Sequence, residues 1–477
     1  MSTITIAWIA LPLFVGFSIY LLPKVDRYLA LAIAIASAGY ASQLFLEPSP
    51  LKLQLLDNFG VTLVADQLSG FFILTNALVT AAVVFYCWQS GKTAFFYTQT
   101  IILHGSVNAA FICADFISLY VALEVISIAA FLLIAYPRTD RSIWVALRYL
   151  FVSNTAMLFY LVGAVLVYQA NHSFAFEGLG KAPPEALALI FLGLLVKGGI
   201  FVSGLWLPLT HSESETPVSA LLSGVVVKTG VFPLVRCALI IEEIDPIVRI
   251  FGVGTALLGV GYAVFEKDTK RMLAFHTISQ LGFILAAPEV GGFYALTHGL
   301  VKSTLFLIAG VLPSRNLKEL QYKPINTPIW IALAMASFSI SGFPLLSGFG
   351  AKVLTIKNLL PWQVIGMNVA ALGTAVSFAK FIFLPHGDGS PEKVKPGFWL
   401  AMILLLGGLI AANGFYYEAY KVPNIAKPLA TIGLGWLAYF LIFKKSVLKL
   451  PRVIEEFEHL IGVMSLMLIL LFWMVFA

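Results

Sequence analysis

Three lysines lie deep within long apolar stretches of the sequence, namely Lys197, Lys228 and Lys352. If these stretches cross a bilayer, a charge at the centre costs at least about 2.5–3.5 kcal/mol on insertion scales. Lysine changes its pKa readily when it loses water, whereas arginine stays charged. A chain that places lysines in such positions holds groups that can gain and lose protons, so the pattern indicates proton transfer.

An acid in a similar position offers these lysines a partner. Glu124 lies in the middle of the apolar stretch LYVALEVISIAAF. An isolated carboxylate is unfavourable there, but a lysine on another helix would keep both groups charged. Weakening that pair would release the proton of the lysine, which is the physical basis of a switch.

Two histidines and two further lysines extend the set. His298 and Lys302 are four residues apart in LTHGLVKSTLF, so they share one face of a helix. His276 opens another apolar run in LAFHTISQ. Lys380 lies near the end of its own run, where a path residue and a lysine that reaches for the interface fit equally well.

The remaining interior polar residues suit structural roles. His104 fits a hydrogen-bonded core position, and Asp66 and Asp115 fit the ends of helices. Arg148 and Arg236 can reach toward an interface with their long side chains. The three cysteines stand singly in apolar runs and indicate neither a disulfide framework nor a zinc site: Cys87, Cys113 and Cys237.

The elements that must position these residues are membrane-spanning helices. The chain is 60% hydrophobic and only 11% charged, against about 25% charged residues in soluble proteins. A span needs about 20 mostly apolar residues. The sequence therefore predicts an all-α polytopic membrane protein with about 16 transmembrane helices. We expect them to be centred near residues 13, 36, 76, 106, 126, 157, 196, 229, 256, 279, 303, 340, 374, 407, 435 and 468.

Charge in the loops predicts the orientation. Most loop lysines and arginines fall on one side of the predicted membrane, here called side A, and among them are Lys267, Lys270, Arg271, Lys393, Lys445 and Lys449. The opposite side, side B, receives Lys52, Lys181, Arg249, Lys357, Lys421 and Lys427. Basic loops stay in the cytoplasm, so side A is predicted to be cytoplasmic and both termini to lie outside. The net charge of +6 is thereby attributed to membrane orientation and not to nucleic-acid binding.

Two of the predicted spans are interrupted. In the seventh, Lys197 is followed by Gly198 and Gly199, and in the twelfth, SFSISGFPLLSGFGAKVL, Pro344 precedes Lys352. Glycine and proline interrupt helices, and freed backbone within a membrane is tolerated only against protein or a watery cavity. A matched pair of interrupted helices indicates an internal repeat.

The spacing of the two interruptions predicts the domain organisation. They lie five spans apart, so two five-helix repeats would insert in opposite orientations, with Lys197 corresponding to Lys352 and Lys228 to Lys380. We expect transmembrane helices 1–3 in residues 1–96 and further C-terminal helices in residues 387–477. The two bundles, each a half-channel, would occupy residues 97–242 and 243–386.

Six stretches carry a family resemblance, and they cover roughly residues 60–385 in order: LYVALEVIS, VKGGIFVSGLWLPLTH, TPVSALLSGVVVKTGVFPLVR, EKDTKRMLAFHTISQLGF, LTHGLVKSTLFLIAG and SGFPLLSGFGAK. Together they resemble the proton-translocating antiporter-like family. That family includes the large membrane-arm subunits of respiratory complex I and of its photosynthetic relatives. It also includes the large subunits of Mrp-type multisubunit cation/proton antiporters.

The resemblance implies roles for particular residues. Glu124 and Lys197 would form a switching pair, and Lys228 would lie at the centre of the first half-channel. His298 and Lys302 would continue the path, and Lys352 would lie at the exit of the second half-channel.

The chain also departs from the family pattern. Leu209 stands where many members have an acid, and the tract HSESET, with Glu213 and Glu215, replaces a more apolar and proline-rich version. Two further spans follow the common core, and a long amphipathic arm is not evident. These features favour the D-type large subunit of Mrp antiporters.

The leading hypothesis is a proton-conducting subunit of a multisubunit Mrp-type Na+/H+ antiporter. One alternative is a proton-pumping membrane-arm subunit of an NADH- or ferredoxin–quinone oxidoreductase, and another is a non-conducting structural subunit. The first hypothesis makes the chain a transporter subunit without chemistry of its own, and a complex I-like assembly would make it a translocase subunit; we expect no cofactor. The expected partners are other membrane subunits, H+, Na+ and the bilayer of the cell (inner) membrane, a thylakoid or another energy-transducing membrane.

Overall fold

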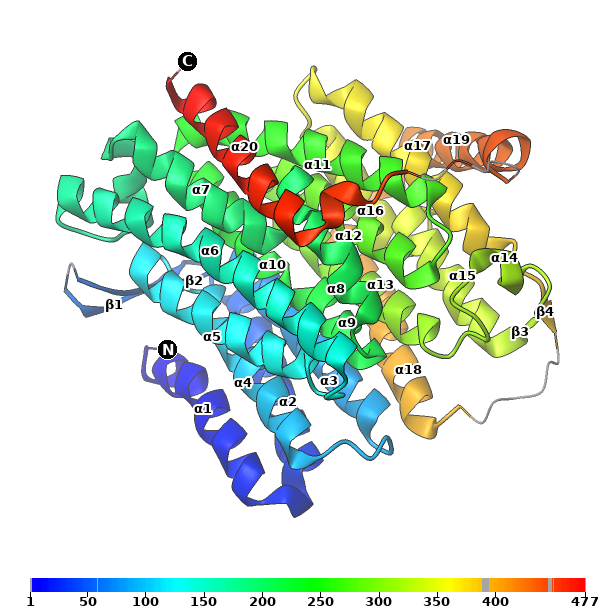
Figure 1. Cartoon of the computed structure of the whole chain (residues 1–477), viewed down its shortest axis with the longest axis horizontal. Coiled ribbons are helices and arrows are strands. Elements are labelled where there is room, and N and C mark those ends of the chain that lie inside the picture. Colours follow the sequence, from blue (N-terminus) through cyan, green and yellow to red (C-terminus); the bar gives the residue numbers. More distant parts are fainter. Residues whose placement is uncertain (1, 58, 388–393, 445–447, 449, 477) are drawn as a thin grey trace.

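The computed structural model describes residues 2–57, 59–387, 394–444, 448 and 450–476. Long helices make up most of this part of the chain and lie side by side (Figure 1). Three lysines that the charge pattern assigns to side A, Lys393, Lys445 and Lys449, lie outside the described residues.

The first part of the chain forms one flank of the molecule (Figure 1). Its elements are α1 (Ser2–Leu21), η1 (Pro23–Val25), α2 (Asp26–Leu46), β1 (Leu51–Leu56), β2 (Gly60–Ala65), α3 (Gln67–Cys87), α4 (Ala94–Ala110), α5 (Phe116–Ile134) and α6 (Asp140–Asn171). Here α1 packs on α4, α2 packs on α3, and α5 packs between α4 and α6.

The middle of the chain alternates long helices with short ones. Its elements are η2 (Phe176–Lys181), α7 (Pro184–Gly198), η3 (Phe201–Trp206), α8 (Leu207–Glu213), α9 (Thr216–Leu221), η4 (Leu222–Val226), α10 (Lys228–Ile240), η5 (Glu242–Ile244), α11 (Asp245–Phe265), α12 (Thr269–Ala286), η6 (Pro288–Val290) and α13 (Gly291–Ala309). Of these, α11 packs along α12, and α7 lies between α6 and α10.

The last part of the chain returns over the earlier helices. Its elements are α14 (Leu317–Leu320), β3 (Ile325–Asn326), α15 (Thr327–Ser341), α16 (Ser347–Lys357), α17 (Gln363–Ile382), β4 (His386–Gly387), α18 (Pro396–Ala411), η7 (Ala412–Ala419), α19 (Val422–Ala438), η8 (Tyr439–Phe443), η9 (Val453–Glu455) and α20 (Phe457–Phe476). Helix α13 is central, because α3, α12, α15, α16 and α18 all pack against it. Helix α20 crosses back to lie on α7 and η3 (Figure 1).

Within the described residues, 13 helices are long and apolar enough to span a membrane. All the predicted span centres fall in helices, but the count of about 16 is not confirmed. The helices outside the count are α4 and α15, with 17 and 15 residues, and α12, which carries Lys270 and Arg271 in its first turn. The protein is thus a multi-span, mostly helical membrane protein, and the inverted repeats remain a prediction.

Two pairs of short strands correct the expectation of a purely α-helical chain. Strands β1 and β2 form an antiparallel hairpin in which Leu51 pairs with Ala65, and β3 and β4 form a two-residue parallel pair. The segment LKLQLL alternates in burial over its first residues, which is typical of a strand with one covered face. The segment is too short to span a membrane, so its sequence predicts only a connecting loop.

Both predicted helix interruptions are confirmed. The first falls between α7 and α8, where Gly199 has φ +69° and Phe201 has φ +52°. The second falls between α15 and α16, where Gly342 has φ +84° and Leu345 has φ +98°. Positive φ stops a right-handed helix and is strained for residues with a Cβ, so glycine is favoured at the turning point.

The predicted structural roles of three polar residues are also confirmed. Asp66 and Asp115 are the N-caps of α3 and α5, where their side chains accept the backbone N–H of Ser69 and Ser118. His104 is a satisfied core residue, and its ring nitrogens contact hydroxyls of α2 and α3 at 2.8 and 3.0 Å.

Candidate functional site

Lys197 lies in the last turn of α7, directly before the first interruption. Its Nζ donates to the carbonyl of Leu123 at 3.1 Å, to the hydroxyl of Ser153 at 2.9 Å and to that of Ser127. Because α5 and α6 supply these acceptors, both helices hold the ammonium. Each hydrogen bond to a charged group contributes about 1.5–3 kcal/mol.

Glu124 lies next to this cluster on α5, and its charge and that of Lys197 act on each other. In the described part of the chain, however, Glu124 forms no ion pair, and its Oε1 is buried without a hydrogen-bond partner. The expected pair is therefore adjacent but open, because the lysine donates to hydroxyls instead.

Lys228 begins α10 directly after η4, a short π-type turn. Its fully buried Nζ donates to the carbonyls of Gly224 at 2.6 Å and Ser223 at 3.3 Å. A Cβ placed on Gly299 would lie 3.6 Å from this Nζ, so α13 passes very close to the lysine. Lys228 thus lies between η4, whose carbonyls it binds, and α13.

Helix α13 brings His298 and Lys302 into the same buried region. The Nζ of Lys302 donates to the carbonyl of Leu273 on α12 and lies 5.2 Å from the centre of the Phe306 ring. The charges of Lys228 and Lys302 both act on His298. Neither ring nitrogen of His298 has a hydrogen-bond partner among the described residues.

His276 lies on α12, fully buried, with its ring 4.7 Å from that of Phe378. The charges of Lys302, Lys380 and Lys352 all act on its imidazole. As with His298, no described group forms a hydrogen bond to its ring nitrogens. His276 is therefore the point at which the three lysines of the second half come within electrostatic reach of one group.

Lys352 follows the second interruption, on α16, and is 5% exposed. No described residue forms a hydrogen bond with its Nζ, which lies 5.4 Å from the centre of the Phe283 ring. A cavity of about 10 Å³ separates the lysine from His298, and Gln280 and Tyr294 line it. One water molecule needs about 10–15 Å³, so this space suits a single water between the two titratable groups.

Lys380 has a different setting from the other predicted lysines. Its Nζ donates to the carbonyls of Ala263, Val264 and Glu266 at 3.2, 2.6 and 2.9 Å, which close the C-terminal end of α11. Cations are favoured at that end of a helix because they compensate its unpaired carbonyls. This geometry accounts for Lys380 as a helix cap.

Two carboxylates outside the membrane-spanning segments anchor the helices that carry these lysines. Burial raises the pKa of Asp66, but the hydrogen bonds and the charge of Arg236 outweigh burial and hold the pKa below its ordinary value. Burial likewise raises the pKa of Glu266, and the backbone N–H groups of Lys267 and Asp268 reverse this shift, so the net pKa is lowered. Both carboxylates are therefore ionised at neutral pH.

Sequence reasoning missed several polar residues that the fold brings next to the buried lysines and histidines described above, which we call the row. Ser127 and Ser153 bind Lys197, and Tyr294 donates to Gln280 Oε1 at 2.6 Å beside Lys352. A helical signal existed for two of them, since Gln280 is four residues from His276 and Tyr294 is four residues from His298. For Ser153 there was no local signal, because only packing of α5, α6 and α7 places it.

Comparison with known proteins supports the family resemblance. The sequence pattern of the family described as "NADH:quinone oxidoreductase/Mrp antiporter, TM" matches residues 113–377. One similar protein is the D-type subunit of the Na(+)/H(+) antiporter of Alkalihalophilus pseudofirmus, 28% identical over 73% of this chain and 78% of its own length. Another is the N-type subunit of the NADH-quinone oxidoreductase of Desulforudis audaxviator, 29% identical over 76% of this chain and 83% of its own length.

Two solved structures share the fold. A chain of the membrane-bound sulfane sulfur reductase, an archaeal respiratory membrane complex, matches with a TM-score of 0.76 and 21% identity over 91% of this chain and 98% of its own length. A chain of the Mrp complex from Dietzia sp. matches with a TM-score of 0.74 and 24% identity over 99% of this chain and 55% of its own length. Since the family pattern covers more than half of the chain, the protein belongs to the NADH:quinone oxidoreductase/Mrp antiporter transmembrane family.

Proposed function

We propose that the protein conducts protons as one subunit of a membrane-embedded ion-transport complex. One observation carries this proposal: in the described part of the chain, the buried lysines of the row form no ion pair with a carboxylate, although each is enclosed by protein. The proposed path consists of Glu124, Lys197, Lys228, Lys302, His298, His276 and Lys352. Lys380 joins it through His276, on which its charge acts.

The geometry supports a relay of two linked halves. The first half is Lys197 and Lys228, held by backbone carbonyls and serine hydroxyls, with Glu124 as the acid that receives Lys197 when its hydroxyl contacts loosen. The second half runs from Lys302 and the histidines to Lys352. A membrane potential supplies about 2.3 kcal/mol per charge per 100 mV, which exceeds the ~1.36 kcal/mol that corresponds to one pKa unit.

We infer that the complex is of the Mrp Na+/H+ antiporter type. The similarity to the D-type antiporter subunit of Alkalihalophilus pseudofirmus supports this assignment. Other membrane subunits would complete the complex, side A would face the cytoplasm, and residues 97–242 and 243–386 would form the two half-channels. The sodium path would lie in another subunit, because the sequence places only Asp66, Asp115 and Glu124 within the predicted spans, and the first two cap helices.

A proton-pumping subunit of a quinone-reducing complex is the second candidate. The similarity to the N-type oxidoreductase subunit of Desulforudis audaxviator favours it, at almost the same identity as the antiporter relative. In that case redox chemistry would reside in partner subunits. Mass spectrometry of the subunits that copurify with the tagged chain separates the two candidates: hydrophilic redox subunits favour the second, and a set of membrane subunits without them favours the first.

Substitution of Lys228 tests conduction itself. The purified complex with Lys228→Ala, reconstituted in liposomes, should lose nearly all sodium-driven proton uptake, measured with an internal pH-sensitive dye. An exposed lysine, Lys24, provides the control, since Lys24→Ala removes a charge outside the row. A normal rate in the assembled Lys228→Ala complex would contradict the relay and favour a structural subunit.

A further inference from the structure

Lys270 occupies an unexpected position. The charge pattern assigns it to a side A loop, but it is the second residue of α12 and only 6% exposed. Its Nζ donates to the carbonyl of Ser214 at 2.9 Å and to the hydroxyl of Ser219 at 3.4 Å. No carboxylate in the described part of the chain forms an ion pair with it. Lys270 therefore resembles the lysines of the proposed path and differs from the loop lysines beside it.

Three ion-paired carboxylates lie within electrostatic reach of this lysine. The carboxylates whose charges act on Lys270 are Asp268, Glu213 and Glu215. Each is already paired with another cation: Asp268 with Arg315 at 3.0 Å, Glu213 with Arg141 at 3.3 Å and Glu215 with Lys92 at 2.6 Å. The side chains of these carboxylates are 24–32% exposed, and we call this partly exposed group of ion pairs the mouth. Solvent therefore reaches the mouth, whereas Lys270 itself is buried.

Through Ser219, Lys270 is also linked to a histidine that is not among the residues of the proposed path. The hydroxyl of Ser219 donates to the carbonyl of His211 at 2.7 Å. His211, on α8, is fully buried, and neither of its ring nitrogens has a hydrogen-bond partner among the described residues. The charges of Lys270 and Lys302 both act on its imidazole. One aromatic ring, that of Phe306, lies 5.9 Å from the His211 ring and 5.2 Å from the Lys302 Nζ.

We propose that Lys270 is the side A entrance of the proton path, and that protons pass from it through His211 to Lys302. This inference rests on the proposed function and adds an access route that joins the row near its centre. It is carried by a buried lysine that forms no ion pair in the described part of the chain, a buried histidine whose ring nitrogens have no hydrogen-bond partner there, and the Phe306 ring, which lies near both His211 and Lys302.

The proton steps balance without another reactant. The Lys270 ammonium gives one proton to a ring nitrogen of His211, becomes a neutral amine and is protonated again by a hydronium ion at the mouth, which leaves water. The His211 imidazolium then gives its other ring proton to the neutral amine of Lys302 and returns to a neutral imidazole. An imidazole has two ring nitrogens, so one can receive a proton while the other gives one, and a bridging water carries each proton where no direct contact exists.

Three substitutions of Lys270 separate a relay from a structural tether. Lys270→Gln and Lys270→Arg both keep N–H donors for the Ser214 carbonyl, but neither side chain releases a proton near neutral pH. Each should lower sodium-driven proton uptake by the reconstituted complex by roughly tenfold or more. Lys270→His should retain more activity than either and should move the optimum to lower pH, because histidine titrates near pH 6.5. The matched control is Lys323→Ala, which removes an exposed lysine from the same side.

A double substitution tests the order of the groups. If Lys270 and His211 act in series, Lys270→Gln combined with His211→Asn should be no slower than the slower single variant. Multiplied losses would mean independent roles and would overturn the route.

The remaining outcomes are equally decisive. A normal rate with Lys270→Arg would show that Lys270 only holds the helices together and would overturn the proposal. If Lys270→Gln fails to assemble, Lys270→Arg takes its place as the test. Lys228→Ala, measured in parallel, separates failure of the proposed entrance from failure of the proposed function. If Lys228→Ala is inactive and Lys270→Gln is normal, only the entrance is wrong, whereas normal rates in both would refute conduction by this chain.

Discussion

At the first interrupted helix, Lys197 lies before the break and donates to acceptors on α5 and α6, whereas Lys352 lies after the second break and donates to no described group. The serine hydroxyls near the two lysines also differ in whether they have a hydrogen-bond partner. Ser127 and Ser153 accept hydrogen bonds from Lys197, but the hydroxyl of Ser339, which lines the cavity beside Lys352, has no partner among the described residues. Two similar helix breaks therefore hold their lysines in opposite ways, one saturated by protein and one left open.

The open side has room for water, and this explains the difference. A buried ammonium without a partner is strongly unfavourable, and the cavity of about 10 Å³ beside Lys352 suits one water. At Lys197, by contrast, protein oxygens take the place of water. We infer that proton release from Lys197 requires side-chain movement, whereas release from Lys352 requires a water molecule.

The largest expected effect concerns stability. Lys197→Met leaves the acceptors on α5 and α6 without a donor and Glu124 without a nearby cation. The free energy of unfolding of the complex should therefore fall by about 2–5 kcal/mol. Lys352→Met removes no protein hydrogen bond and should change stability by less than about 1 kcal/mol. Both should abolish transport. Unfolding temperatures of the two purified complexes, taken at one heating rate, check this contrast, and equal losses would remove the distinction between the breaks.

The next effect concerns the cavity near Lys352. Tyr294→Phe removes the hydroxyl that donates to Gln280 and faces the cavity, so the single water loses an anchor. Transport should fall by about three- to tenfold while stability changes little. Initial rates of proton uptake measure the change. Tyr168→Phe, at the far end of α6, is the control, and unchanged transport in Tyr294→Phe would mean that protons do not cross this cavity.

The smallest effect concerns the glycines at the two turning points. Both have positive φ, so Gly199→Ala and Gly342→Ala should each cost about 1–2 kcal/mol. Only at Gly342 would the new Cβ meet a lysine, because it would lie 2.9 Å from Lys352 Cδ, whereas at Gly199 it would meet Leu207. Transport should therefore fall several-fold in Gly342→Ala alone. Parallel stability and transport assays decide this, and an equal loss of transport in both variants would contradict the assignment.

Sequence reasoning located the helices and their interruptions because those signals are local. Apolar length predicts a span, and Gly199 and Gly342 mark the breaks by themselves. The mid-span lysines were equally visible, since a charge in an apolar run is conspicuous.

Contacts between distant segments were not visible in the sequence. The Ser153 hydroxyl meets Lys197 only because α6 packs on α7, and Glu124 lies beside that lysine without pairing to it. Lys270 was assigned to a loop because positive charge near a span end predicts orientation but not burial. The hairpin of β1 and β2 was missed because a short alternating segment resembles a connecting loop.

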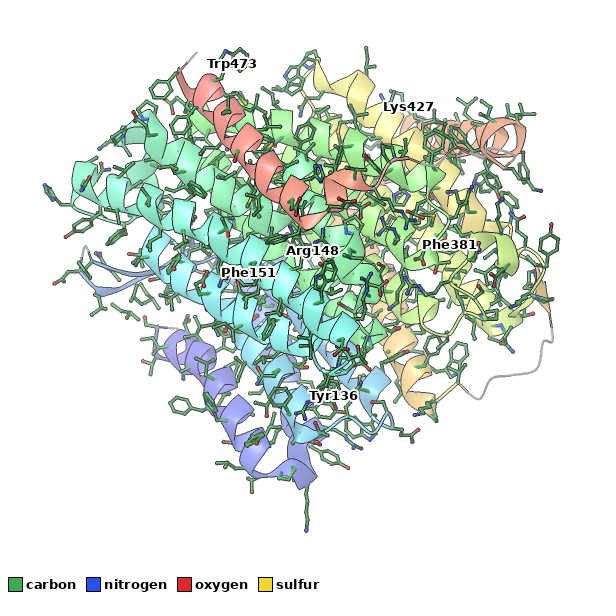
Figure 2. The ribbon with its side chains drawn as sticks, viewed as in Figure 1. Tyr136, Arg148, Phe151, Phe381, Lys427 and Trp473 are labelled. Carbon is green, nitrogen blue, oxygen red and sulfur yellow. The ribbon has the colours of Figure 1, made fainter. Side chains whose placement is uncertain are left out.

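A last consequence follows from the path of α20. Arg271 holds Glu455, just before α20, at 2.6 Å, and Arg148 on α6 donates to the Glu455 carbonyl; Figure 2 shows Arg148 beside the start of this helix and Trp473 toward its other end. This clasp seats α20 against the interrupted α7 and η3. During biosynthesis, α7 enters the membrane long before α20 exists, and its broken backbone then lacks the covering that bilayer-embedded backbone requires. The backbone at the first break is thus fully covered by protein only late in translation, after the distant helix α20 has been made.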